Sequence, residues 1–175
     1  TQLISSNQHS FDISKADHPG PSISQDGSVI AYMNTTFSAE PNYTNNKQIY
    51  VWDAASQTNM LVSAAPDGIA HANSNSSSPV LSADGRTLAF LSLATNLDVN
   101  TPATSRGRIY IRNLVTGVTK LASLETNSNK PQEDDIEDPV LSADGSLIVF
   151  ESASDGLVEN DNNGENDVFL NNTQN

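Results

Sequence analysis

A seven-residue block of the form Pro-x-x-Ser-x-Asp-Gly occurs three times in the chain, at 21–27, 79–85 and 139–145. Successive copies begin about 60 residues apart, and a long internal period is the sequence signature of stacked supersecondary units. Each unit in such an array buries its apolar surface against its neighbours, so the repeat constrains the fold more than any single motif does. We expect one repeat domain over 1–175, with units at about 19–78, 79–138 and 139–175, the last completed by residues 2–5.

Each unit has the pattern of a four-stranded antiparallel meander. In the second unit, 79–82 predicts a short first strand, and an Ala-Asp-Gly turn leads into a nearly continuous apolar strand at 86–92. A polar loop precedes a third strand at 108–114, and a Thr-Gly turn separates it from a fourth strand at 119–124. No stretch shows helical periodicity, so the expected fold class is all-β.

A second block, Ile-Tyr-Val-Trp-Asp at 49–53, follows the first block at a nearly constant distance and corresponds to 109–113 and 167–171. Together the two blocks resemble the repeat of TolB-type β-propellers, whose blades are four-stranded antiparallel sheets. The resemblance covers about 19–171 and implies a propeller-type fold with three blades. It implies no single function, because this fold hosts binding proteins, enzyme accessory domains and adhesin modules. Propellers of this family usually have six or more blades.

The beginning of the chain bears on this low number of blades. Residues 2–5, Gln-Leu-Ile-Ser, resemble the fourth strands of the first two units at 59–63 and 120–123. We therefore expect the N-terminal segment to act as a fourth strand, while the third unit stops after its third strand. One hypothesis is a homodimer in which two half-rings pair head to tail, each donating its first strand, and close a six-bladed ring. The alternative is a compact three-repeat monomer or a fragment of a larger protein.

Charge and composition exclude several classes of function. With 8 Lys and Arg residues against 21 Asp and Glu residues, the formal net charge is −13, which repels phosphate backbones and disfavours nucleic acid as a partner. The absence of Cys excludes disulfides and thiolate metal sites. No apolar run of about 18 residues and no basic leader is present, so we expect neither membrane insertion nor a signal peptide. This composition favours an extracellular or cell-surface bacterial protein, with the periplasm as the alternative.

A loop before the last strand reads Asp-Asn-Asn-Gly-Glu-Asn-Asp and resembles the start of a calcium loop. Asp161, Asn163 and Asp167 are candidate metal ligands through their side chains, and Glu165 through its backbone carbonyl or side chain. Asn162 is a candidate ligand-binding residue. TolB-type repeats of bacterial surface proteins often carry a similar loop here, so the resemblance also implies calcium. A solvated turn in an Asn-rich loop is the alternative, and the full EF-hand spacing is absent.

The second acidic feature lies just before the first strand of the third unit, where five of six consecutive residues are carboxylates. Their mutual repulsion raises their pKa values unless a cation or a basic partner neutralises them. Asp134, Asp135 and Asp138 are candidate calcium ligands, and Glu133 and Glu137 are candidate ligand-binding residues. In a meander, this segment and the calcium-like loop emerge at the same end of the sheet, so we expect one acidic face. A charged loop that confers solubility is the alternative.

Two functions from different classes follow from these features. The first is an extracellular, calcium-dependent, adhesin-type module that binds a peptide or glycan on another protein or cell surface. The second, which the family resemblance implies, is a structural or protein-interaction propeller of the periplasm that needs no metal. An enzyme is not expected, because no hydrolase, metalloprotease or phosphate-loop motif accompanies the histidines His9, His18 and His71. A glycosidase with paired carboxylates is a third and less favoured interpretation.

Overall fold

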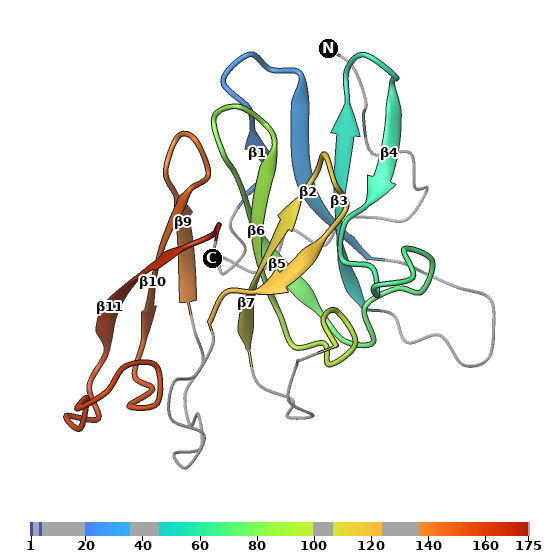
Figure 1. Cartoon of the computed structure of the whole chain (residues 1–175). Coiled ribbons are helices and arrows are strands. Elements are labelled where there is room, and N and C mark those ends of the chain that lie inside the picture. Colours follow the sequence, from blue (N-terminus) through green and yellow to red (C-terminus); the bar gives the residue numbers. More distant parts are fainter. Residues whose placement is uncertain (2–3, 5–19, 36–45, 100–106, 124–136, 175) are drawn as a thin grey trace.

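A computed structural model describes the following residues of the 175-residue chain: 1, 4, 20–35, 46–99, 107–123 and 137–174. These residues form eleven strands and no helix, which confirms the all-β prediction. The strands are grouped into three antiparallel sheets, and within each sheet the strands pair in the order of the sequence. This is the meander expected from the repeat (Figure 1).

The three sheets are built alike. The first sheet contains β1 (Ser22–Ile23), β2 (Val29–Thr35), β3 (Lys47–Asp53) and β4 (Thr58–Leu61). The second contains β5 (Ser76–Leu81), β6 (Thr87–Ser92), β7 (Arg108–Asn113) and β8 (Thr119–Leu121). The third contains β9 (Glu137–Leu141), β10 (Leu147–Ser152) and β11 (Asp167–Asn172), and no fourth strand among the described residues.

The short turns that join the first and second strands lie at one end of the sheets, which we call the turn end (Figure 1). In the second sheet, Asp84 accepts hydrogen bonds from the Ser82 hydroxyl (2.6 Å) and the Arg86 N–H (3.0 Å). Ser82 in turn accepts from the Thr87 N–H at 3.0 Å. Gly85 has a φ of 68°, a conformation that glycine adopts without strain. The first and third sheets repeat these bonds, so the seven-residue block encodes one turn.

The sheets stack face to face, with the first strand of each sheet against the preceding sheet. The buried side chains form two apolar layers, one between each pair of neighbouring sheets. The layer between the first and second sheets comprises Ala31, Met33, Ile49, Val51, Val62, Ala72, Leu81, Leu88, Phe90, Ala94, Leu97, Tyr110 and Leu121. The layer between the second and third sheets comprises Ala89, Ile109, Ile111, Ala122, Ile148, Phe150, Leu157 and Phe169. Complete burial of one Leu, Ile or Phe side chain contributes about 1.5–3 kcal/mol.

A stacked aromatic pair joins the second and third strands of every sheet. The ring centroids are 6.0 Å apart in the first sheet, 5.8 Å in the second and 5.7 Å in the third. Aromatic cross-strand pairs of this kind stabilise a sheet beyond the apolar area that they bury. The pairs are Tyr32 with Tyr50, Phe90 with Tyr110, and Phe150 with Phe169. They occupy equivalent positions in the three sheets.

Two details of the sequence-based alignment are wrong. The third copy of the second block is 168–172 and not 167–171, because Phe169 and not Val168 pairs with the aromatic residue of the second strand. The first strand of the second sheet begins at Ser76, ahead of the predicted 79, and a register shift after Ser77 marks a bulge. The additional residues at the start of this strand are polar and do not alternate with apolar residues, so the sequence pattern does not reveal them.

Candidate functional site

The β10–β11 loop lies at the end of the third sheet opposite its β9–β10 turn, and we call this end the loop end (Figure 1). In the third sheet, Glu151 near the end of β10 pairs with Glu137 at the start of β9, and Ser152 pairs with Asp167 at the start of β11. The acidic segment before β9 therefore enters the sheet at the end where the β10–β11 loop emerges. The expectation that both acidic features share one end of the third sheet agrees with this register for Glu137.

The structure describes only some of the other residues that were predicted from the acidic segment. Asp138 follows Glu137 on β9. Glu133, Asp134 and Asp135 lie outside the described residues, so their assignment as metal or ligand-binding residues stays a prediction.

Hydrogen bonds within the β10–β11 loop define its conformation. The Gly164 N–H donates to Asp155 at 3.1 Å and ties the middle of the loop to its beginning. The Asn163 side chain uses both ends of its amide, since Nδ2 donates to Asp167 at 2.8 Å and Oδ1 accepts from the Glu165 N–H at 2.9 Å. Gly164 has a φ of 65°, which explains the glycine at this position. Asn163 thus acts as the bridge that holds the loop against the start of β11.

The calcium assignment of this loop stays a prediction. Asp161 and Asp167 line one shallow depression of about 410 Å³ that also contacts β11. The Asn163 oxygen faces a backbone donor, so Asn163 would have to rotate its amide before it could bind a cation beside Asp167. Within the described ranges, no group of three or more His, Asp and Glu side chains is arranged to hold a metal ion. Calcium prefers six to eight oxygen ligands, so backbone carbonyls and water would supply most of them.

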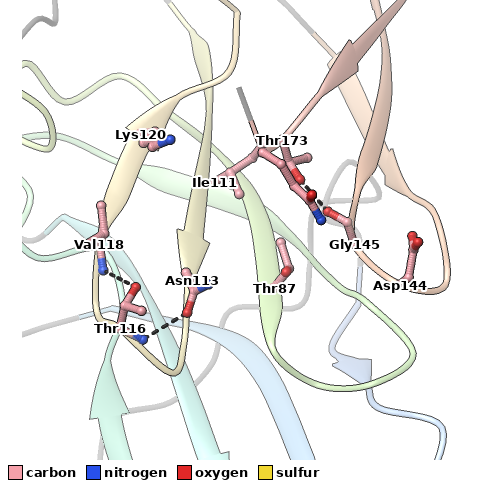
Figure 2. A pocket seen from close by; sticks show the side chains of 10 residues that line it. Thr87, Ile111, Asn113, Thr116, Val118, Lys120, Asp144, Gly145 and Thr173 are labelled. Carbon is pink, nitrogen blue, oxygen red and sulfur yellow. Dashed lines mark hydrogen bonds between the residues drawn. The ribbon is translucent and has the colours of Figure 1, made fainter.

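A second pocket, of about 320 Å³, lies at the turn end between the second and third sheets (Figure 2). Sequence reasoning missed it, although the repeated Asp-Gly turn marks one of its walls. Its polar groups bond to their own turns: the Thr116 N–H donates to Asn113 at 2.8 Å, and the Thr173 hydroxyl donates to the Gly145 carbonyl at 2.6 Å. The lining residues are Thr87, Ile111, Asn113, Thr116, Val118, Lys120, Asp144, Gly145, Thr173 and Gln174. The pocket is a crevice between packed turns.

Comparison with solved structures decides how these stacked sheets are classified. The crystal structure of TolB from Acinetobacter baumannii matches 90% of this chain at a TM-score of 0.51 and 20% sequence identity. The fold is a TolB-like β-propeller. The match covers 30% of the TolB chain, so this propeller spans less than a third of the length of that protein. At this identity the comparison establishes the fold alone.

Other solved structures match the propeller less well. They include the β-propeller domain of the Trilobed protease from Pyrococcus furiosus (TM-score 0.48, 15% identity, 77% of this chain and 34% of that chain). The tricorn protease matches at a TM-score of 0.49 and 13% identity, over 77% of this chain and 11% of that chain. A scan against protein-family models and a search of curated proteins gave no match. No helix formed by the described residues is long and apolar enough to cross a membrane.

The Ser–Asp pairs of the propeller look superficially like catalytic groups, but their chemistry is that of a turn. Hydrogen bonds from the backbone N–H of Ser28 and from the Ser24 hydroxyl lower the pKa of Asp26 to about 2. Donors of the same kind, led by the Ser142 hydroxyl, lower the pKa of Asp144 to about 2. A carboxylate with so low a pKa is a poor general base near neutral pH. These pairs stabilise turns and do not activate the serines.

Proposed function

We propose that this propeller is a non-catalytic protein-interaction module that binds a basic peptide segment of another protein at its acidic loop end. The observation that carries the proposal is the concentration of carboxylates there. From β9 to the start of β11 the chain places Glu137, Glu151, Asp155, Glu159, Asp161, Glu165 and Asp167 at or next to the loop end of the third sheet. Fixed negative charge on one side of a protein attracts and orients a positively charged partner.

The arrangement favours a peptide over a single ion. Glu159, Asp161 and Asp167 line the same depression, yet they are not arranged to hold one metal ion. Separate cationic side chains on a peptide can each meet one carboxylate. The net charge of −13 adds a long-range attraction for a basic partner. Such a module suits an extracellular or periplasmic protein that contacts other proteins.

The test uses octalysine as the probe and isothermal titration calorimetry at low salt. We expect the unmodified chain to bind octalysine, and the variant Glu159→Gln/Glu165→Gln to bind it at least several-fold more weakly. Affinity should fall as salt increases, because screening weakens exposed charge pairs. The matched control is Asp26→Asn/Asp53→Asn, which removes the same charge from turns at the opposite end. Equal weakening in both variants would show an unspecific charge effect and contradict the proposal.

A calcium-dependent form of the same module is the second candidate. It is favoured by the position of Asp161 and Asp167 on one depression. A calcium ion there would tie the β10–β11 loop to β11 and order the acidic end for a peptide or glycan ligand. The further ligands that we propose are Asp134 and Asp135 of the segment before β9 and Asp138 of β9.

Thermal unfolding in EDTA and in millimolar calcium separates the two candidates. Calcium at about 100 times the dissociation constant of its site adds roughly 2.7 kcal/mol to the free energy of unfolding. Tm should therefore rise by several degrees in a chain of this size. The rise should disappear in the variant Asp161→Asn/Asp167→Asn. Coincident melting curves for the unmodified chain would exclude the calcium-dependent form and leave the metal-independent module.

A further inference from the structure

The third sheet exposes an apolar face, whereas the corresponding faces of the first and second sheets are buried. We define this rear face by the residues Val140, Val149, Val168 and Leu170. Val168 and Leu170 are 68% and 65% exposed. Their equivalents in the second sheet, Ile109 and Ile111, are 0% and 8% exposed, because the third sheet packs on them. Apart from Glu151, which pairs with Val168 on the same face, the rear face has the composition of an interface between sheets.

The first sheet presents the complementary face. We define this front face by the residues Ile23, Ile30, Tyr32, Tyr50 and Trp52. Ile23 is 60% exposed, whereas its equivalent in the second sheet, Leu81, is 8% exposed. The Tyr32–Tyr50 pair is half-buried, and the equivalent Phe90–Tyr110 pair is fully buried against the first sheet. The two outer faces are thus the two halves of the contact that recurs inside the chain.

A relay of backbone hydrogen bonds gives this contact a direction. The Gln25 N–H donates to the Ala83 carbonyl, and the Ala83 N–H donates to the Ala143 carbonyl, each at 2.8 Å. Each turn therefore donates to the sheet that follows it and accepts from the sheet that precedes it. If the relay continued by one step, the Ala143 N–H would donate to the backbone carbonyl of a residue equivalent to Gln25. The first sheet of a second copy carries that carbonyl.

Ile4 lies where a preceding sheet would place its fourth strand. In the third sheet, the Asn171 side chain donates to the carbonyl of Ala122, which follows β8 in the second sheet, at 2.6 Å. In the first sheet, Asn59 donates to the Ile4 carbonyl at 3.0 Å, and Asn59 pairs with Trp52 of the front face. Ile4 and Ala122 are each the middle residue of a Leu-x-Ser sequence. The contact of Ile4 with the front face is therefore the contact that a fourth strand makes with the sheet that follows it.

We propose that two copies of this chain pair head to tail, with the front face of each copy against the rear face of the other. In this assembly, Ile4 of one copy lies beside β11 of its partner, in the position of a fourth strand. The occupant is a second copy because one chain carries both complementary faces. Propellers have about four to eight blades, so two copies close a ring of six, whereas three copies would exceed that range.

The first sheet shows which hydrogen bonds the added strand makes. There, the Val62 N–H donates to the Ile49 carbonyl at 2.8 Å, and the serine that follows Val62 accepts from the Ile49 N–H at 2.9 Å. In the ring, the Ile4 N–H donates to the Val168 carbonyl of the other copy. Ile4 and Val168 are then directly opposite each other.

Size-exclusion chromatography with light scattering measures the mass of the assembly. We expect about 37 kDa for two copies of the 18.6 kDa chain. The variant Val168→Asp/Leu170→Asp should run as a single chain, and it should stay folded because both side chains are exposed. The control Ile69→Asp/Val115→Asp changes residues that are 82% and 74% exposed in loops outside both faces, and it should remain paired. A single-chain mass for the unmodified protein at micromolar concentration would overturn the proposal.

Cysteine cross-linking tests the strand exchange itself, since the chain has no Cys of its own. Two variants, Ile4→Cys and Val168→Cys, are mixed and oxidised. Residues directly opposite each other in neighbouring strands are close enough for a disulfide, so we expect a cross-linked pair that contains one copy of each variant. Val115→Cys mixed with Ile4→Cys is the matched control and should remain uncross-linked. Equal cross-linking in the control, or none in the test mixture, would overturn the proposal.

Discussion

At the scale of the residue, the Asp of each turn is held by short hydrogen bonds from its own turn. Backbone and hydroxyl donors lower the pKa of Asp144 to about 2, and they also lower the pKa of Asp84. The Asp-Gly pair and its hairpin could be predicted from sequence, because the signal is local. The contact between neighbouring turns could not, since it depends on residues about 60 positions apart.

The lowered pKa of Asp144 predicts an acid-sensitive turn. Its folded pKa lies below its usual value of 3.8, so the ionised turn is stabilising above about pH 4 and loses this effect as the pH falls toward 2. Asp144→Asn should therefore lower the urea midpoint at pH 5 and differ progressively less from the unmodified chain between pH 4 and pH 2. A difference that stays constant over this range would contradict the assignment.

Gly145 is expected to be the least replaceable of the turn glycines. Its φ is 68°, and a Cβ atom there would meet the Thr87 side chain of the second sheet at 2.6 Å. Gly145→Ala should destabilise the fold by about 2–5 kcal/mol, because the left-handed strain and the steric overlap add. Gly68→Ala is the control, with a φ of 71° and no atom within 4 Å, and should cost about 1–2 kcal/mol. Chemical unfolding measures both, and equal losses would argue against the packing of turn on turn.

At the scale of the element, the number and type of strands followed from the repeat, but the register of β11 did not. Asn171 and Asn172 are the same residue type, so either could be matched to Asp53 of the first sheet. The aromatic pair resolves this ambiguity only when the partner strand is known. Pairing of the third strand with the fourth also depends on a buried serine, which no strand pattern reveals.

Ser63 is the serine that closes the outer edge of the first sheet. It is fully buried, accepts from the Ile49 N–H at 2.9 Å and donates to the Gln48 side chain. Ser63→Ala should cost about 1–3 kcal/mol, because a buried donor and a buried acceptor lose their partner. Ser123→Ala should cost less, since the equivalent bond to the Ile109 N–H is 3.3 Å long. Thermal or urea unfolding checks the order, and a larger loss at Ser123 would contradict it.

At the scale of the whole molecule, the repeat predicted the propeller fold. The acidic loop end could be placed from topology alone, because both loops must leave the sheet at the same end. The exact ligands could not, since Asn163 turns its oxygen to a backbone N–H and much of the acidic segment lies outside the described residues. The complementary outer faces also escaped the sequence pattern, because exposure depends on which sheets are stacked.

Amide hydrogen exchange on the unmodified chain, followed by NMR at a concentration where two copies pair, tests the central claim most directly. Val168 and Leu170 occupy the positions of Ile49 and Val51, so their N–H groups face the strand that the second copy supplies. We predict that these two amides exchange as slowly as the amides of Ile49 and Ile109. Fast exchange at Val168 and Leu170, with Ile49 and Ile109 still protected, would show that β11 is an unpaired edge and would contradict the closed ring.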